Sequence, residues 1–137
     1  MITLQKHKND VWEIKINRPE KANSLSSSML EELLSIFDKA AEARGVVLTG
    51  QGTTFSAGAD LNEVKSGLAI SPIWEKLSEK IAKLNCITIA ALNGTVAGGA
   101  FGMILACDIR ICVPKARFFY PVMKMGFLPQ PSDPKRL

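Results

Sequence analysis

Short apolar runs alternate with amphipathic segments along this chain, and that alternation is what most restricts its fold. Residues 45–50 and 86–92 are continuous in apolar and β-branched side chains, which is typical of strands buried on both faces. Segments 28–41 and 73–84 carry apolar residues at helical spacing. Residues 11–16 alternate apolar and polar side chains, which predicts a half-buried strand. The pattern predicts an α/β fold with parallel strand pairing.

The remaining elements are shorter. Ser28 is predicted to begin the first helix, because a glutamate three residues later completes a capping box. An apolar helix is predicted from the glycine pair at 98–99 through residue 106, with strands at 109–111 and 118–120. The tail over 129–137 is proline-rich and charged, so no packing element is expected there. A length of 137 residues suits one domain, 1–137.

Composition excludes several classes of protein. With 47% hydrophobic residues the chain is globular, yet no apolar run approaches the roughly 18–20 residues of a membrane span. The N-terminus has no leader-like pattern, so we expect a cytoplasmic protein. A net charge of +4 from scattered lysines argues against nucleic acid and suits a small polyanionic ligand.

The cysteines and the single histidine do not form a recognisable metal-binding or redox site in the sequence. Cys86, Cys107 and Cys112 lack metal-ligand spacing and are expected to be buried free thiols. The single histidine, His7, lies among polar residues at an expected turn and is not a catalytic candidate. We therefore expect neither a metal nor a separate cofactor.

Two loops of small residues follow the two buried runs. Residues 55–61 follow the first run and residues 93–100 follow the second, each where a helix is expected to begin. The first N–H groups of a helix have no intrahelical partner, and small side chains let a ligand approach them. Two such junctions on neighbouring strands could direct two N–H groups at one carbonyl oxygen, as in an oxyanion hole. Either loop alone is more simply explained by turn and packing requirements.

Taken together, the ordered blocks of this sequence resemble the crotonase superfamily, which includes enoyl-CoA hydratases and isomerases. The matching blocks are Asn17-Arg18-Pro19, Lys21-Ala22-Asn23-Ser24-Leu25, Val47-Leu48-Thr49-Gly50, Phe55-Ser56-Ala57-Gly58-Ala59-Asp60-Leu61, Ala91-Leu92-Asn93-Gly94, Ala97-Gly98-Gly99 and Ala106-Cys107-Asp108-Ile109-Arg110. The resemblance implies a spiral of ββα units, an acyl-CoA substrate and a homo-oligomer, usually a trimer or hexamer. The family's later helical region has no counterpart before Leu137, so we expect a chain shortened relative to the family.

The resemblance also assigns roles to residues. Backbone N–H groups of Ala59 and Gly99 would hold the thioester oxygen. The substrate would further contact the residues that match the family's binding segments, which are Lys21, Ala22, Ala57, Asp60, Leu61 and Asn62. Coenzyme A enters as part of the substrate.

Both glutamates of the family's hydratases are replaced, by Gly102 and Val122, and neither replacement can transfer a proton. Phe101 and the segment 122–129 instead resemble decarboxylases of polyketide β-branching within the same superfamily. Three activities stay open: an enoyl-CoA hydratase/isomerase-like enzyme, an enolate-forming decarboxylase, and a non-catalytic acyl-CoA-binding or assembly subunit. Three other polar candidates have ordinary structural explanations: Asp60 as a helix cap, Glu63 on a solvated face, and Tyr120 at an interface or in the core. Tyr120 and Gln130 are expected near the pocket.

Overall fold

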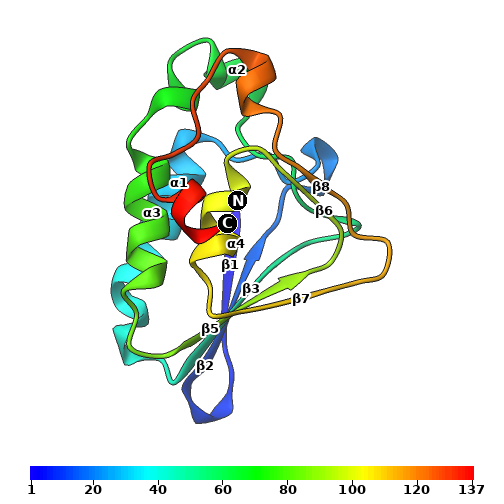
Figure 1. The fold of residues 1–137 in the computed structure, drawn as a ribbon. Coiled ribbons are helices and arrows are strands. Elements are labelled where there is room, and N and C mark those ends of the chain that lie inside the picture. Colours follow the sequence, from blue (N-terminus) through cyan, green and yellow to red (C-terminus); the bar gives the residue numbers. More distant parts are fainter.

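A mixed five-stranded sheet forms the centre of the computed structural model, which describes all 137 residues (Figure 1). The strand order is β1-β2-β3-β5-β7. The parallel pairing that was predicted holds for β2-β3, β3-β5 and β5-β7. The pair β1-β2 is antiparallel and was not predicted. The strands are β1 (Ile2–Lys6), β2 (Val11–Ile16), β3 (Gly45–Gly50), β5 (Ile87–Leu92) and β7 (Ile109–Cys112).

Three short parallel strands form a second sheet. Its strands are β4 (Thr54–Ser56), β6 (Thr95–Ala97) and β8 (Phe118–Phe119), in that order. Each follows a strand of the main sheet and leads into a helical segment, so the chain repeats a unit of two strands and a helix. The α/β fold and the ββα repeat are therefore confirmed.

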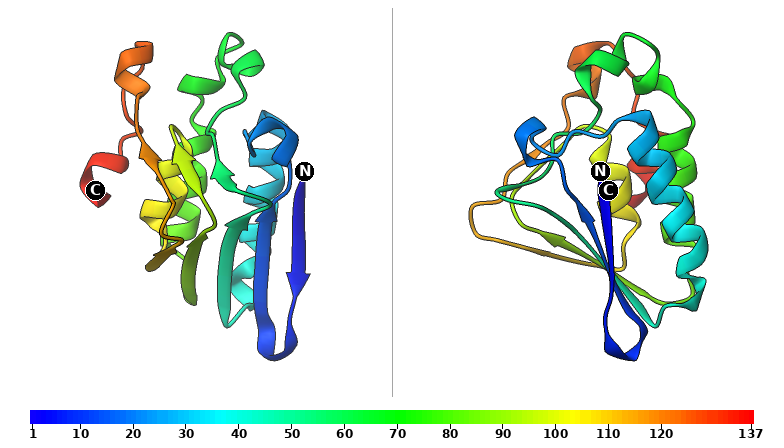
Figure 2. Two further views of the ribbon diagram at one scale, coloured as in Figure 1. Left: turned by 90° about the vertical axis from the view of Figure 1, so that its right-hand side faces the viewer. Right: turned by 180° about the vertical axis from the view of Figure 1, so that it is seen from behind.

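Helices cover one side of the main sheet (Figures 1 and 2). The three longest are α1 (Ser27–Lys39), α3 (Ile73–Ala82) and α4 (Ala100–Ala106), and single turns form α2 (Leu61–Val64) and α5 (Asp133–Arg136). Short 3₁₀ turns are η1 (Lys8–Asp10), η2 (Pro19–Lys21), η3 (Ala40–Glu42), η4 (Leu68–Ile70) and η5 (Val122–Met125). None of the helices has the length and apolar character needed to cross a membrane.

The hydrophobic core lies between these helices and the sheet. Its members come from α1, α3, α4 and one face of the strands, and include Leu30, Leu33, Phe37, Trp74, Leu77, Ile81, Met103, Ile14 and Leu48. The predicted apolar face of α1 is thus confirmed, but its predicted start is wrong by two residues. Ser26 is the cap, because its Oγ accepts a hydrogen bond from the Met29 N–H at 3.3 Å.

The opposite face of the main sheet differs from the prediction. Val46 and Leu48 of β3 are buried, whereas Val47 is only half-buried. Farther along the sheet, Ile87 and Ile111 are each 58% exposed. The expectation of strands buried on both faces is wrong, because helices cover one face only.

The tail also differs from the prediction. Residues 133–136 form α5, which packs beside α4 (Figure 1), and Asp133 is completely buried. Glu75 on α3 anchors this turn, because its carboxylate accepts hydrogen bonds from the backbone N–H of Ser132 at 3.2 Å and from the Ser132 hydroxyl. The tail therefore contains a packing element, and a buried carboxyl lies within it.

The cysteines are free, as predicted, but only one of them is fully buried. Burial raises the pKa of the Cys107 thiol to about 12, so this thiol is unreactive near neutral pH. Cys86 is half-buried and Cys112 is exposed, and the expectation that all three are buried is wrong for these two.

Candidate functional site

The two loops of small residues touch each other. They follow β4 and β6, which are neighbouring parallel strands, so their carboxyl ends meet at one edge. A methyl group placed on Gly58 would lie 2.7 Å from the Ala97 carbonyl oxygen and 3.3 Å from the Gly99 nitrogen. Gly58 is thereby brought to van der Waals contact with a loop about 40 positions later in the sequence.

The loops leave two backbone N–H groups without a partner. The N–H groups of Ala59 and Gly99 donate no hydrogen bond within the chain, whereas those of Asp60 and Gly98 do. The Asp60 N–H donates to the Leu25 carbonyl at 2.9 Å, and the Gly98 N–H donates to the Phe119 carbonyl at 3.0 Å. Gly99 is the residue before the first turn of α4, where an N–H has no intrahelical acceptor.

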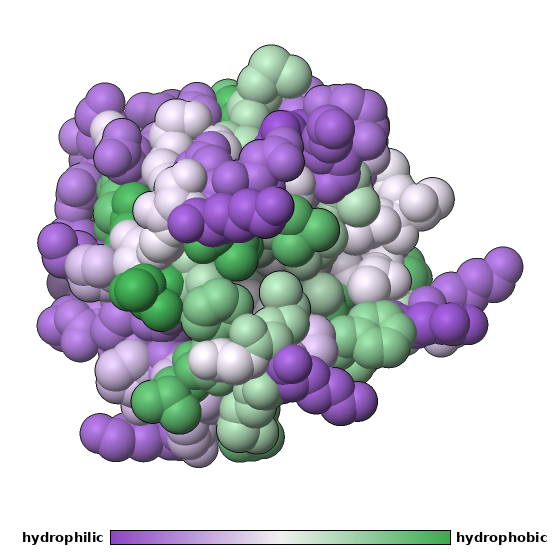
Figure 3. Space-filling view, turned by 90° about the horizontal axis from the view of Figure 1, so that it is seen from above, coloured by the Kyte–Doolittle hydropathy of each residue, from purple (hydrophilic) through white to green (hydrophobic).

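Both of these residues line a cavity that is partly open to solvent. Its wall is mostly apolar and contains no charged side chain. Tyr120 contributes a hydroxyl group to the wall and Gln130 contributes an amide group. The full lining is Ala57, Ala59, Leu61, Val64, Ala69, Trp74, Ala97, Gly98, Gly99, Tyr120, Pro121, Val122, Met125, Phe127, Leu128 and Gln130. Seen from above, apolar residues gather in the middle of this end of the molecule (Figure 3).

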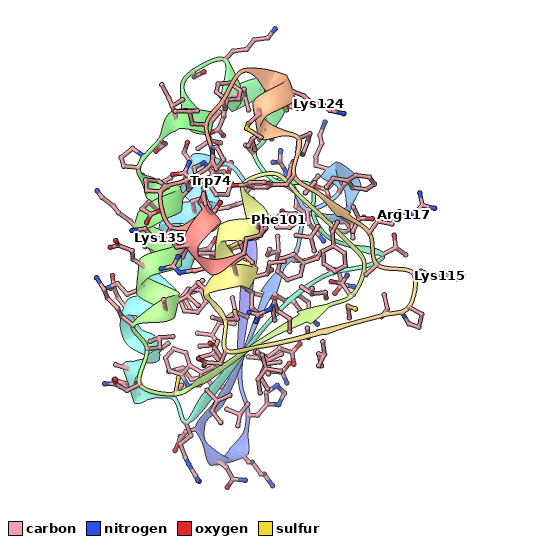
Figure 4. The ribbon with its side chains drawn as sticks, viewed as in Figure 1. Trp74, Phe101, Lys115, Arg117, Lys124 and Lys135 are labelled. Atoms are coloured by element: carbon pink, nitrogen blue, oxygen red, sulfur yellow. The ribbon has the colours of Figure 1, made fainter.

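Two aromatic side chains hold residues of the cavity wall in place: Trp74 lies in the wall against Gly99, and Phe101 packs against Tyr120. Trp74 is fixed by a hydrogen bond from its indole N–H to the Leu68 carbonyl at 2.8 Å, and a methyl group on Gly99 would meet its ring at 3.0 Å. The Phe101 ring is buried and packs 5.0 Å from the ring of Tyr120. Figure 4 labels Trp74 and Phe101 in the interior, while Lys115, Arg117 and Lys124 project at the periphery.

The structure separates the sequence-predicted substrate residues into two groups. Ala57, Ala59, Leu61 and Gly99 line the cavity. The others lie outside its wall: Lys21, Ala22, Asp60 and Asn62. The Ala22 carbonyl accepts a hydrogen bond from the Ala57 N–H at 3.0 Å, which holds the 21–22 backbone against the first loop.

The two carboxylates nearest the first loop are occupied by structural contacts. Asp60 caps α2 through the Asn62 N–H at 2.9 Å and pairs with Arg18 at 2.6 Å. The Asn62 N–H and then Arg18 hold the pKa of Asp60 below its usual range. Glu63 accepts hydrogen bonds from the Ser27 N–H at 2.8 Å and the Ser27 hydroxyl at 2.6 Å. The predicted solvated role of Glu63 is therefore wrong, because it anchors the start of α1.

The two positions of the missing glutamates have different surroundings. Val122 lines the cavity. Gly102 is buried in α4, one turn after Gly99, and a methyl group there would lie 3.1 Å from Oδ1 of Asp133. The space next to Gly102 is thus filled by a carboxyl group from α5.

Asp133 is the polar residue that sequence reasoning missed. Its Oδ2 accepts a hydrogen bond from the Tyr120 hydroxyl at 2.5 Å, and its Oδ1 is buried without a partner. Burial raises the pKa of Asp133 above its usual range; burial, and then the neighbouring Asp133, raise the pKa of Tyr120. No pattern in the polar tail signals this burial, because the contacts come from elements far away in sequence.

His7 lies far along the chain from this site, in the connection between β1 and β2, with its Nε2 3.0 Å from Glu13. No group of three or more His, Cys, Asp or Glu side chains is arranged to hold a metal ion.

Comparison with known proteins agrees with this architecture. Residues 6–135 match the family described as enoyl-CoA hydratase/isomerase. An ethylmalonyl-CoA decarboxylase from Pongo abelii is 30% identical, over 99% of this chain and 48% of its own length. A probable enoyl-CoA hydratase from Mycobacterium bovis is 38% identical, over 85% of this chain and 49% of its own length. This chain spans about half the length of the curated relatives that it matches.

A solved structure has the same fold. The crystal structure of an enoyl-CoA hydratase from Bacillus anthracis superposes with a TM-score of 0.87 at 32% identity, covering 98% of this chain and 56% of that one. The superposition therefore covers nearly every element described above. Sequence blocks, fold and family match agree, and the chain belongs to the enoyl-CoA hydratase/isomerase family of the crotonase superfamily.

Proposed function

We propose that the protein binds an acyl-CoA thioester in the cavity and stabilises the enolate form of its acyl group. The thioester oxygen would accept two hydrogen bonds, from the N–H groups of Ala59 and Gly99. Negative charge develops on that oxygen when an enolate forms, so donors directed at it lower the barrier. Lys21, next to Ala22, whose carbonyl accepts a hydrogen bond from the first loop, would supply positive charge for the polyanionic coenzyme.

The observation that carries this proposal is the pair of unpaired N–H groups in an apolar wall. Each belongs to a different loop, and the loops are in contact at Gly58. Hydrogen bonds in a poorly solvated cavity are electrostatically stronger than in water. An acyl group of mostly apolar character also fits the lining, which has no charged side chain.

A decarboxylase is the second candidate, and the uncharged wall favours it over a hydratase. Hydration needs groups that move protons to and from water, and each typically contributes about 10²–10⁴-fold to the rate. Loss of carbon dioxide from a malonyl-type thioester needs no base, because the electron pair of the broken C–C bond passes into the enolate. The relative described as an ethylmalonyl-CoA decarboxylase is consistent with this choice.

The test combines a binding titration with two turnover assays. Isothermal titration with acetyl-CoA measures binding, while crotonyl-CoA and ethylmalonyl-CoA report hydration and decarboxylation. We expect binding, decarboxylation, and little or no hydration. Binding without turnover of either substrate would favour the non-catalytic subunit, and no binding to the folded protein would refute the proposal.

Variants at Gly99 isolate its N–H group. Gly99→Pro removes the donor, and the observed φ of −58° suits proline. Gly99→Ala places the same kind of atom against Trp74 but keeps the donor, so the difference between the two variants reports the N–H alone. We expect Gly99→Pro to lose a further 10²–10³-fold in turnover, about 2.7–4 kcal/mol. Gly45→Ala is the control for substitution itself, because a methyl group there only makes ordinary contact with the Ile87 carbonyl.

A further inference from the structure

A buried carboxyl group lies next to Gly102, where this chain has a glycine in place of the glutamate of the family's hydratases. Oδ1 of Asp133 lies 3.1 Å from the point where a methyl group on Gly102 would be. Gly102 follows Gly99 by one helical turn, so the carboxyl lies beside the helix whose first turn presents the free N–H. The carboxyl group next to Gly102 therefore comes from Asp133 in the tail and not from a residue of α4.

The surroundings of Asp133 leave half of the carboxyl unused. Its Oδ1 is buried and has no hydrogen-bond partner. Arg136, on the same turn, donates to the Ser78 hydroxyl at 3.0 Å and makes no hydrogen bond with Asp133. Glu75 on α3 faces it with like charge while accepting from Ser132. A buried polar group left unpaired is costly, so its retention calls for an explanation.

Tyr120 connects this carboxyl to the cavity. Its side chain forms part of the cavity wall, and its hydroxyl donates to Oδ2 of Asp133 at 2.5 Å. Packing against the Phe101 ring fixes the orientation of the phenol. One side chain therefore touches both the space for the acyl group and the buried carboxyl.

We propose that Tyr120 and Asp133 form a relay that moves a proton between the substrate α-carbon and the protein interior. This inference rests on the proposed function, since it needs a thioester enolate in the cavity. Tyr120 is the group that touches the substrate, and Asp133 acts through it. The relay supplies the proton transfer that Gly102 and Val122 cannot.

Protons and electrons balance in each direction. When the α C–H bond breaks, its electron pair passes into the enolate, the phenolic oxygen takes the proton, and the original phenolic proton moves to Oδ2 of Asp133. In reverse, Asp133 in its acid form returns a proton through Tyr120 to the α-carbon of an enolate, including one left by decarboxylation. The carboxyl then exchanges its proton with solvent.

The electrostatics of the pair suit this role. Burial, together with the like charge of Glu75, raises the pKa of Asp133, while Tyr120 and Arg136 oppose the shift. The neighbouring helix α4, whose Gly102 lies next to the carboxyl, contains no ionisable side chain. A carboxyl with a raised pKa holds and releases protons closer to neutral pH than an ordinary aspartate does.

The test is deuterium exchange at the α-carbon of butyryl-CoA in D₂O, measured by mass spectrometry with the wild-type protein and its variants. Tyr120→Phe keeps the ring packing, and Asp133→Asn keeps an acceptor for the Tyr120 hydroxyl. We expect each to reduce exchange by about 10²-fold or more while butyryl-CoA binding changes less than about threefold. Wild-type exchange should fall as the pH drops through the Asp133 pKa, and Asp133→Asn should lack that fall.

Ser132→Ala is the matched control for a merely structural role. It removes the hydroxyl that ties α5 to Glu75 without touching the cavity. We expect it to lower the melting temperature and leave the exchange rate within about threefold. Exchange at the wild-type rate in Tyr120→Phe would overturn the relay, as would equal loss in Ser132→Ala or binding by wild type without any exchange. Failure of wild type to bind butyryl-CoA would instead refute the proposed function.

Discussion

The two loops can meet because Gly58 has no Cβ atom. This residue has φ +88°, in the left-handed region that side chains with a Cβ rarely adopt. The Cβ atom of any other residue would also collide with the Ala97 carbonyl oxygen, at 2.7 Å. The small residues that suggested a ligand site in the sequence are therefore required first for the contact between β4 and β6.

Gly58→Ala should be much more harmful than the same change at Gly67. Gly67 has a similar φ of +97° but nothing within 4 Å of an added methyl group, so it measures the backbone strain alone. We expect Gly58→Ala to cost roughly 1–3 kcal/mol more, the typical price of overpacking. Urea denaturation of both variants measures the difference. If the two variants lose the same free energy of unfolding, the close contact between the loops at Gly58 does not contribute to stability.

At the scale of elements, long periodic segments were predictable, whereas the short strands β4 and β6 were not. The apolar spacing of α1 and α3 and the alternation in β2 identify these elements, because each spans enough residues to repeat its period. The strands β4 and β6 have three residues each and carry no period, whereas β8 falls within the strand predicted over 118–120. Their pairing depends on the main sheet that aligns them, so residue patterning alone does not predict the second sheet.

The candidate site, like the fold, was predictable only in part from the sequence. Small residues at strand ends gave the loops, and Ala59 and Gly99 both line the cavity, while their proposed oxyanion role stays a prediction. Asp133 could not be found in this way, because its burial depends on Glu75 and Tyr120, which approach it only after folding. Local sequence near residue 133 is polar and contains two prolines nearby, which is the usual signature of an exposed tail.

Asp108 should join two elements, β5 and β7, more strongly at neutral than at acid pH. Its Oδ2 accepts hydrogen bonds from the Thr88 N–H and hydroxyl, both at 2.8 Å. These bonds lower the pKa of Asp108, so their stabilisation is present above the ordinary aspartate pKa and is lost as the pH falls through the lowered value. Asp108→Asn should cost about 1–2 kcal/mol at pH 7 and much less at pH 3.

Thermal unfolding of both proteins at the two pH values measures this effect. Asp10→Asn is the control, because it removes the same charge from a side chain that makes no hydrogen bond, at a left-handed φ that asparagine tolerates. A constant difference between Asp108→Asn and wild type across the pH range would contradict the assignment.

At the scale of the whole molecule, the outward face of the main sheet changes character from one edge to the other. One row across it runs Thr3, Lys15, Thr49, Ala91 and Ile111. The row one step along runs Gln5, Glu13, Val47, Ile89 and Ile109. The β1–β2 half is polar and suits solvent, whereas the β5–β7 half is apolar and half-exposed or exposed. Exposed contiguous apolar surface favours association.

We therefore expect this protein to self-associate through the β5–β7 half of the face. Ile109→Lys with Ile111→Lys places two charges on β7 and should shift the protein toward monomer in sedimentation equilibrium. Because the β1 ends of the same rows already lie in a polar setting, Thr3→Lys with Gln5→Lys adds the same charge without touching the apolar half. That control should associate as wild type does. If wild type is monomeric at every concentration tested, or if the control dissociates equally, the apolar half of the face is not the contact surface, and net charge or another region governs association.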